Sequence, residues 1–151
     1  MIASAPAIAP AMTTRGSAVD DYPSGVLDTC AYIDLDVLDP AALPATPEIT
    51  AVTLAELHQG VAMATDPAER AARTEKLGAA VGDFEPLPFD GAAAARYGTL
   101  VALVVNAGRS PRPRRMDLMV GAVASAHGLP LFTRNARDFR GLQDVLTVVE
   151  V

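Results

Sequence analysis

The 151-residue sequence predicts an α/β fold in three layers, with a central, mostly parallel sheet flanked by helices. Three observations support this prediction. Short apolar runs of strand length alternate along the chain with segments whose apolar residues recur at helical spacing. Half of the residues are hydrophobic, which is enough for a core. Aromatic residues make up 5% and Trp is absent, which favours close helix packing over a β-sandwich.

The N-terminal residues 1–24 are rich in Ala and Pro, and we expect a flexible leader there. The leader lacks the basic start of a secretory signal peptide. We place one domain over residues 25–151, without an internal repeat and without an apolar run long enough to cross a membrane. The single cysteine, Cys30, excludes an internal disulfide and fits a reducing compartment, so we expect a cytoplasmic protein.

The first half of the domain predicts a strand, a helix, a second strand and two more helices. Asp28 and Thr29, both common N-cap residues, follow the first strand. A β-branched run predicts the second strand, and Thr50 or Thr53 can cap the helix after it. Pro67 fits the first position of the last helix. The predicted ranges are 26–27, 30–35, 48–53, 54–63 and 66–77.

The second half predicts an extended segment, two helices joined by an Arg/Pro-rich loop, and two strands. Tyr97, Leu100 and Val104 have the spacing of one helix face. Gly108 and Gly128 can end the two helices. Strands that alternate with helices pair in parallel through crossover connections. The predicted ranges are 84–89, 90–106, 109–115 for the loop, 116–128, 129–133 and 146–151.

Asp28 is the first candidate functional residue, because it directly follows the first strand. Ligands of open parallel sheets bind at the carboxyl ends of strands. Glu56 and Asp117 each lie near the start of an otherwise apolar helix, where a carboxylate is costly to bury unless it is paired or bound to a metal. Carboxylates from three separate elements suit Mg²⁺ or Mn²⁺, which prefer oxygen ligands.

Each of these carboxylates also has a simpler explanation. Asp28 can be a helix N-cap and nothing more. Glu56 and Asp117 can stabilise helix dipoles, an effect below about 1 kcal/mol at the surface. These explanations cover each residue singly but not the recurrence of the pattern. We therefore predict an acidic cluster that binds a divalent metal ion and supports hydrolysis of a phosphodiester by metal-activated water.

Four segments together resemble the PIN-domain family, and within it the VapC-type ribonuclease toxins of bacterial type II toxin–antitoxin modules. Each segment alone is a weak motif, but the four in this order and spacing make a specific match. The resemblance covers about residues 25 to 151 and implies a three-layer PIN-like fold. The four segments are Val26–Leu35, Thr53–Gly60, Arg115–Ala124 and Gly128–Phe139.

The resemblance implies a Mg²⁺- or Mn²⁺-dependent endoribonuclease that cleaves structured RNA, such as tRNA or rRNA, and thereby inhibits translation. It carries Asp28, Glu56 and Asp117 over as catalytic and metal-binding residues. It also implies a homodimer and a VapB-type antitoxin whose C-terminal segment covers the acidic groove. An arginine of that antitoxin would make a charge-assisted contact there.

The fourth acidic position of the family falls on Asn135, where this sequence departs from the pattern. An asparagine can coordinate through its carbonyl oxygen or position a water, but it adds no charge. We therefore expect one metal ion rather than two, with Asn135 as a catalytic candidate. Asp138 can replace the missing carboxylate, although a turn anchored by Phe139 also explains it. Thr133 can hydrogen-bond a neighbouring carboxylate.

The charges are unevenly distributed along the chain. Residues 1–108 contain 5 Lys or Arg and 14 Asp or Glu, whereas residues 109–151 contain 7 Arg and 4 acidic residues. The net charge of −6 by itself favours an ordinary acidic protein. The Arg-rich loop precedes Asp117 closely, so its side chains can hold RNA phosphates, or they can simply be solvated. The candidate RNA-binding residues are Arg112, Arg114, Arg115 and Arg134, with Arg109 and Arg137 similarly placed.

The remaining metal-binding or nucleophilic residues receive structural interpretations. His58 lies two residues after Glu56 and so faces another side of the helix. His127 precedes Gly128 at a helix end, where a cation suits the dipole. Cys30 has no histidine partner in the sequence, so we do not expect a nucleophilic cysteine.

Three other functions compete with the nuclease. A phosphatase of the haloacid-dehalogenase type needs a second Asp two positions after Asp28, where Cys30 stands. A nucleotide-binding protein needs a Gly-rich loop after the first strand, and none follows it. A catalytically silent PIN-like module that acts as a binding or regulatory subunit stays open because of Asn135.

Overall fold

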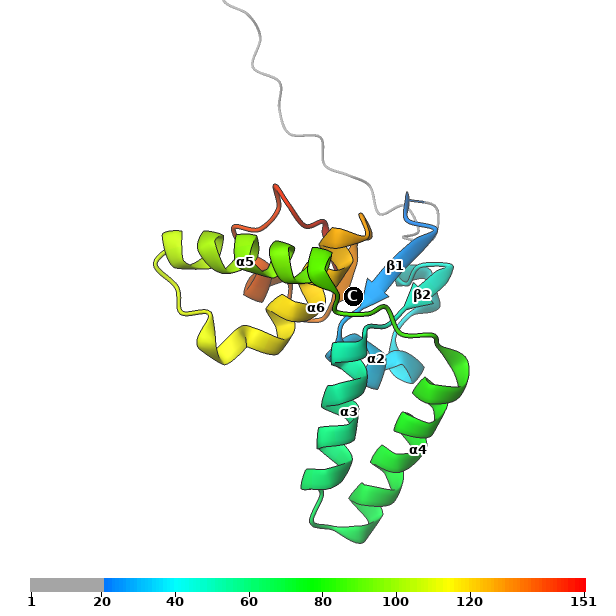
Figure 1. Cartoon of the computed structure of the whole chain (residues 1–151). Helices are drawn as coiled ribbons and strands as arrows, with labels where there is room; N and C mark the ends of the chain where they lie inside the picture. The colour runs from blue at the N-terminus through cyan, green and yellow to red at the C-terminus, as the bar shows by residue number, and fades with distance from the viewer. Residues whose placement is uncertain (1–20) are drawn as a thin grey trace, which may run out of the picture.

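The structure is a computed structural model, and it describes residues 21–151 (Figure 1). Its four strands form a single sheet in the order β2-β1-β3-β4, and every neighbouring pair is parallel. This confirms the predicted α/β fold with a parallel sheet. The strands are β1 Ser24–Leu27, β2 Thr46–Glu48, β3 Leu131–Thr133 and β4 Val148–Glu150.

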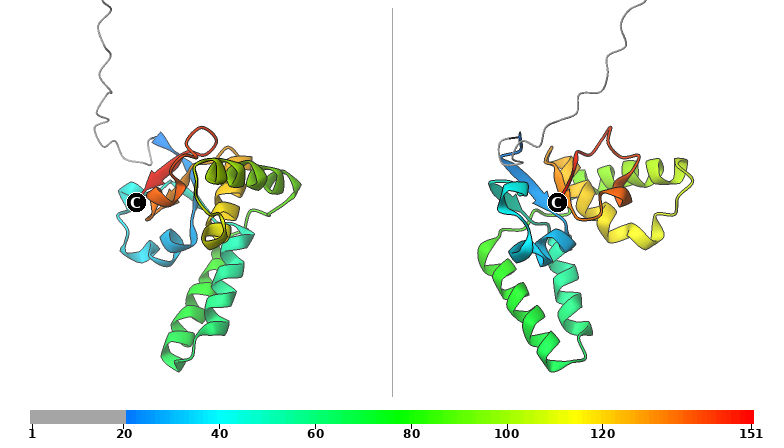
Figure 2. Two further views of the ribbon diagram at one scale, coloured as in Figure 1. Left: turned by 90° about the vertical axis from the view of Figure 1, so that its left-hand side faces the viewer. Right: turned by 180° about the vertical axis from the view of Figure 1, so that it is seen from behind.

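Helices cover both faces of this sheet (Figures 1 and 2). Helices α3 and α4 form a hairpin that extends away from the sheet, whereas α5 and α6 pack against each other beside it. The α-helices of the described chain are α2 Thr29–Ile33, α3 Ala51–Met63, α4 Pro67–Asp83, α5 Gly91–Asn106 and α6 Arg115–Ala126. The short 3₁₀ helices are η1 Leu35–Val37, η2 Pro40–Ala42, η3 Arg112–Arg114 and η4 Ala136–Phe139.

The two central strands contribute to two separate cores, because successive strand residues point to opposite faces. Val26 and Leu131 pack with residues of α5 and α6. Leu27 and Phe132 pack with residues of α2, α3 and α4. All four side chains are fully buried. Since both faces are covered, consecutive residues of each strand are apolar here instead of alternating with polar ones.

Gly25 allows β1 to pass directly beneath an aromatic ring. A Cβ atom at this position would collide with the ring of Phe132. Tyr22 packs edge-on against the same ring, with centroids 6.3 Å apart. Tyr22, which lies inside the range 1–24 that we expect to be a leader, therefore packs against the core. Residues 1–20 of that range lie outside the described residues.

The second predicted strand is wrong in its boundaries. β2 ends at Glu48, and residues 51–53 form the first turn of α3. The Thr50 hydroxyl caps this helix by accepting a hydrogen bond from the Thr53 backbone N–H at 3.0 Å. This local bond favours a helix start over the strand that a β-branched run suggests. Glu56 consequently lies in the second turn of α3.

The predicted residues that begin or end these helices are confirmed, although α4 continues to Asp83, beyond the predicted end at residue 77. Asp66 caps α4 and Pro67 occupies its first turn. Gly108 and Gly128 adopt φ values of 73° and 65° just after α5 and α6, a conformation that glycine adopts without strain. Within residues 21–151, none of the helices has the length and apolar character needed to cross a membrane.

Candidate active site

Asp28 lies at the carboxyl end of β1, next to the end of β3. Its backbone N–H donates to the Phe132 carbonyl at 3.0 Å. One carboxylate oxygen, Oδ1, accepts from the Ala31 N–H at 2.8 Å and caps α2. The other, Oδ2, accepts from the Thr133 hydroxyl. Asp28 is therefore a helix cap, and it is also held from the neighbouring strand by a second donor.

The side chain of Asp28 is only 3% exposed. Burial raises the pKa of its carboxyl, while the hydrogen bonds from Thr133 and Ala31 oppose that rise. Its donors are all neutral, and no lysine, arginine or histidine in residues 21–151 forms an ion pair with it. Burying a carboxylate without a counter-charge is unfavourable, so a bound cation would lower the free-energy cost of burying Asp28.

Glu56 reaches the same edge of the sheet from α3. Its Oε2 accepts a hydrogen bond from the hydroxyl of Thr29, the first residue of α2. Burial and the Asp28 charge raise the pKa of Glu56, and the bond from Thr29 lowers it. This role of Thr29 was not predicted, although its hydroxyl directly follows Asp28 in the sequence.

Asp117 enters the cluster from the first turn of α6. Burial, followed by the charges of Glu56, Asp28 and Asp138, raises the pKa of Asp117 to about 6, and Arg114 acts in the opposite direction. Charges affect one another in this way only when they are close. The structure thus brings together the three carboxylates that the sequence singled out.

The donor chemistry of this cluster fits Mg²⁺ or Mn²⁺. Carboxylate oxygens are the ligands that these ions prefer, and a cation would offset the repulsion among them. In this conformation, no three His, Cys, Asp or Glu side chains of residues 21–151 are close enough to hold one ion by themselves. Mg²⁺ commonly keeps several waters beside one or two carboxylates, so a complete protein cage is not required.

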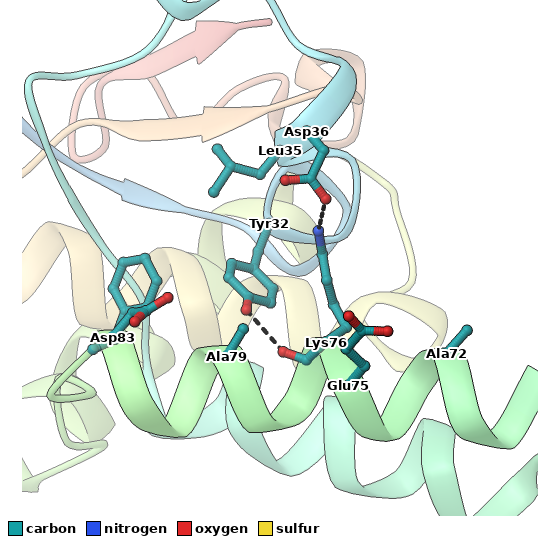
Figure 3. A pocket seen from close by; sticks show the side chains of 9 residues that line it. Tyr32, Leu35, Asp36, Ala72, Glu75, Lys76, Ala79 and Asp83 are labelled. Carbon is teal, nitrogen blue, oxygen red and sulfur yellow. Dashed lines mark hydrogen bonds and ion pairs between the residues drawn. The ribbon is translucent and has the colours of Figure 1, made fainter.

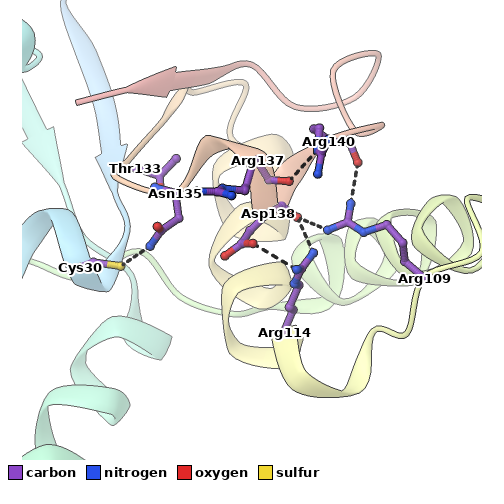
Figure 4. A network of polar contacts seen from close by, with 8 residues as sticks. All are labelled: Cys30, Arg109, Arg114, Thr133, Asn135, Arg137, Asp138 and Arg140. Atoms are coloured by element: carbon purple, nitrogen blue, oxygen red, sulfur yellow. Dashed lines mark hydrogen bonds and ion pairs between the residues drawn. The ribbon is translucent and has the colours of Figure 1, made fainter.

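Asn135 lies beside this cluster and contacts a thiol. Its Nδ2 donates to Cys30 Sγ at 3.7 Å, and its backbone N–H donates to the Thr133 hydroxyl at 3.0 Å (Figure 4). The thiol in turn lies 3.8 Å from Asp28 Oδ2. Burial and the charges of Asp28 and Asp117 raise the pKa of Cys30 to about 11, so the thiol stays protonated.

Asp138 is tied to two arginines of the α5–α6 connection (Figure 4). Its Oδ1 forms an ion pair with Arg114 Nη2 at 3.1 Å. Its backbone carbonyl accepts from Arg109 Nη2 at 2.9 Å and from Arg114 Nη1 at 3.4 Å. Phe139 is buried beneath this segment, as expected for a turn anchored by its aromatic residue.

The other polar candidates are spread over the surface. Arg134 pairs with Asp34 near α2. Arg112 and Arg115 are exposed at the start of α6, and His58 is exposed on α3. His127 is the C-cap residue of α6. The two histidines therefore stand apart from the hydrogen bonds of the acidic cluster.

Two hollows flank helix α4. One, of about 380 Å³, is lined by Tyr32, whose hydroxyl donates to the Lys76 carbonyl at 2.9 Å (Figure 3). None of the three cluster carboxylates lines it. The other, of about 500 Å³, includes Glu56 and the side chain of Ile33, which is 50% exposed. An apolar groove thus opens beside the acidic cluster.

Comparison with known proteins identifies the family. The family model of the PIN domain matches residues 26–144. Ribonuclease VapC5 of Mycobacterium tuberculosis (strain ATCC 25618 / H37Rv) is 38% identical over 128 residues, which cover 83% of this chain and 92% of the relative.

Solved structures agree with this assignment. The crystal structure of VapBC-5 from M. tuberculosis, a member of the VapBC family of toxin–antitoxin systems, gives a TM-score of 0.72 at 34% identity and covers 85% of this chain and 99% of its own. The crystal structure of FitAcB from Neisseria gonorrhoeae gives a TM-score of 0.64 at 25% identity and covers 83% of this chain and 96% of its own. The chain therefore belongs to the PIN-domain family and, within it, to the VapC-type proteins.

Proposed function

We propose that this protein is a Mg²⁺- or Mn²⁺-dependent endoribonuclease whose reaction centre is formed by Asp28, Glu56 and Asp117. The observation that carries the proposal is the meeting of three partly or fully buried carboxylates, from three separate elements, at the carboxyl edge of a parallel sheet. A bound ion of this kind polarises a phosphodiester and lowers the pKa of a water.

The protein's own groups have distinct tasks in this proposal. Asp28 and Asp117 are the principal metal ligands, and Thr133 fixes the orientation of Asp28 through its hydroxyl. Glu56, fixed by Thr29, completes the cluster through water or orients the nucleophile. Asp117 has a pKa of about 6 and is therefore mostly ionised near neutral pH, as a metal ligand must be. Asn135 lies close enough to Thr133 and Cys30 to position a water at the edge of the cluster.

RNA is the proposed substrate because the relative with 38% identity is named a ribonuclease. We propose structured RNA such as tRNA or rRNA, with inhibition of translation as the result. Neutralisation by a VapB-type antitoxin is proposed because the structural neighbour with 34% identity is a member of the VapBC family. The apolar groove with the half-exposed Ile33 supports a protein partner beside Glu56. A homodimer is part of the same proposal.

One feature favours the alternative of a catalytically silent module. Asn135 stands where the family has an acidic residue, and its amide contacts the Cys30 thiol instead of a carboxylate. In that alternative the protein binds RNA or its partner without cleaving RNA.

The test uses purified protein without antitoxin, incubated with total tRNA in Mg²⁺, Mn²⁺ or EDTA. Asp28→Asn keeps the helix cap but removes the charge, and we expect it to lower the cleavage rate by about 10²–10³-fold. The matched control is Asp66→Asn, the same change at an exposed helix cap, which should leave cleavage unchanged. Cleavage that survives EDTA, or equal cleavage by Asp28→Asn, would contradict the metal mechanism. RNA binding without cleavage in any metal would favour the silent module.

A further inference from the structure

We infer that five of the seven arginines between residues 109 and 140 fall into two groups with different tasks. Arg109 and Arg114 position the η4 segment beside the acidic cluster, whereas Arg112, Arg115 and Arg137 bind the phosphate backbone of the RNA. This inference rests on the proposed function, because it names the contacts that the RNA would make next to the same site.

The first group is already committed to the protein. The Arg109 guanidinium makes two hydrogen bonds: its Nη1 donates to the Arg140 carbonyl and its Nη2 donates to the Asp138 carbonyl, both at 2.9 Å. Arg114 contacts the Asp138 carboxylate at 3.1 Å and its carbonyl at 3.4 Å (Figure 4). A planar guanidinium suits such paired contacts. We call these contacts of Arg109 and Arg114 the arginine clamp.

The arginine clamp joins two borders of the reaction centre. η4 begins directly after Asn135, and α6 carries Asp117 in its first turn. The Asp138 charge raises the pKa of both Asp28 and Asp117, so this carboxylate lies within the electrostatic field of the cluster. The arginine clamp therefore fixes the position of Asp138. In this position Asp138 supplies negative charge on the side of the cluster where Asn135 supplies none.

The side chains of the second group have no hydrogen-bond or ion-pair partner among residues 21–151. The side chains of Arg112, Arg115 and Arg137 are exposed, and within residues 21–151 they take part in no ion pair and donate no hydrogen bond. Arg112 and Arg115 flank Arg114 in the sequence, and Arg137 precedes Asp138, so all three are sequence neighbours of the ion pair between Arg114 and Asp138. They add positive charge without a counter-charge to the segments that carry the arginine clamp, in a protein whose net charge is −6.

The surface offers no aromatic platform on which bases could stack. All seven aromatic residues, four Phe and three Tyr, lie within the described chain, and none of them is exposed. Base stacking on aromatic side chains is the usual source of affinity for single strands besides charge. Affinity must then depend mainly on phosphate contacts, and such binding weakens steeply with salt.

The first experiment measures the affinity for a fluorescein-labelled single-stranded RNA by fluorescence anisotropy, in EDTA, over a series of salt concentrations. Arg112→Gln, Arg115→Gln and Arg137→Gln should each reduce the slope of log affinity against log salt by about 0.7, the value for one phosphate contact on a single strand. Arg109→Gln should leave the slope unchanged. The control Arg70→Gln removes an exposed arginine near the tip of the α3–α4 hairpin and should also leave it unchanged.

The second experiment uses lysine substitutions, which keep the charge but lose the two-pronged geometry. Arg70→Lys, the matched control outside both groups, should retain both kcat and KM. Arg109→Lys should lower kcat and raise the Mg²⁺ concentration for half-maximal cleavage, each by about tenfold, without changing KM for RNA. A thermal melt of each variant confirms that it is folded at the assay temperature.

Two results would overturn the inference. One is a parent protein without salt-dependent RNA binding, or an Arg109→Gln variant whose slope falls as much as that of Arg112→Gln. The other is an unchanged Mg²⁺ dependence of Arg109→Lys. Failure of the proposed function would look different, because the parent would not cleave RNA, or would cleave it in EDTA, while the binding series would still separate the two groups of arginines.

Discussion

Helices α2 and α4 begin with the same cap but belong to regions with different chemistry. Asp28 accepts a hydrogen bond from the N–H three residues on at 2.8 Å, and Asp66 does so at 2.9 Å. Asp66 is exposed at the tip of the α3–α4 hairpin, whereas Asp28 is buried at the carboxyl edge of the sheet. The two cap hydrogen bonds are thus nearly equal in length and span the same number of residues.

The difference between the two caps comes from segments far away in the sequence. Thr133 is 105 residues from Asp28 and donates to it, and the charges of Asp28 and Glu56 raise the pKa of Asp117. Asp66 has none of these neighbours and keeps only its cap bond. An aspartate at a helix cap therefore becomes a reactive-site candidate through its tertiary neighbours, because the cap itself is the same in both places.

The largest contrast between the two caps is expected in the response to divalent ions. An ion present at about 100 times its Kd stabilises the folded protein by about 2.7 kcal/mol, so the Tm of the parent should rise in MgCl₂. Asp66→Asn should keep this rise and Asp28→Asn should lose most of it, because Asn supplies no charge. Thermal melts followed by circular dichroism measure the effect. An equal rise in both variants would remove Asp28 from the metal site.

Removal of the second donor to Asp28 is expected to have the next largest effect. Thr133→Val keeps the shape of a buried side chain but leaves a buried carboxylate with one donor fewer, at a cost of about 1–3 kcal/mol in the free energy of unfolding. Thr133→Ser should restore most of the loss. Thr65→Val, an exposed control beside Asp66, should stay within about 0.5 kcal/mol. Urea denaturation distinguishes these results, and equal losses at both positions would contradict the prediction.

The pH dependence of stability should differ between the cluster and the hairpin. The pKa of Asp117 is about 6 in the folded protein, above the ordinary 3.8, so the folded state binds more protons between these values. The metal-free protein therefore loses stability as pH rises from about 4 to about 6, by about 1–2 kcal/mol after allowance for partial exposure.

Asp117→Asn should remove this loss of stability, so the variant tests the direction of the pH dependence. In EDTA the variant should be more stable than the parent above about pH 6, and the difference should vanish as the pH falls below 3.8, the ordinary pKa of an aspartate. Thermal melts across this pH range provide the measurement. A difference that grows toward low pH would show that the Asp117 carboxylate is stabilised rather than destabilised by its surroundings.

The smallest effect is expected at the hairpin cap itself. Asp66→Ala removes only the bond to the Glu69 N–H and should cost about 1 kcal/mol in the free energy of unfolding, while Asp66→Asn should cost a few tenths. Both variants should cleave RNA at the rate of the parent. A loss of cleavage in either one would show that the hairpin takes part in substrate binding.

The sequence predicted the elements best where local chemistry decides them. The cap at Asp66, the proline after it and the glycines after α5 and α6 depend on neighbouring residues alone. The predicted boundary between β2 and α3 was wrong because four of the six residues 48–53 are β-branched, which favours a strand. The Thr50 hydroxyl nevertheless caps a helix at this place.

The site was predictable as a set of residues but not as an arrangement. The order of the motifs singled out Asp28, Glu56 and Asp117. The hydrogen bond from the Thr29 hydroxyl to Glu56, however, joins residues that are 27 positions apart. The same limit applies to the arginines. Arg114 and Arg134 were grouped with the RNA-binding candidates, but the structure pairs them with Asp138 and Asp34 through tertiary contacts that sequence spacing does not reveal.

The strand order β2-β1-β3-β4 also determines when this protein can become active during its synthesis. β1 can pair with β2 after about twenty further residues have been made, but β3, which completes the edge at Asp28, follows more than a hundred residues later. Parallel pairing over such a distance is slow, because a long loop must close first. A ribosome must therefore translate the chain as far as β3 before Asp28 meets Thr133, and a product that ends before β3 lacks the hydroxyl that holds Asp28.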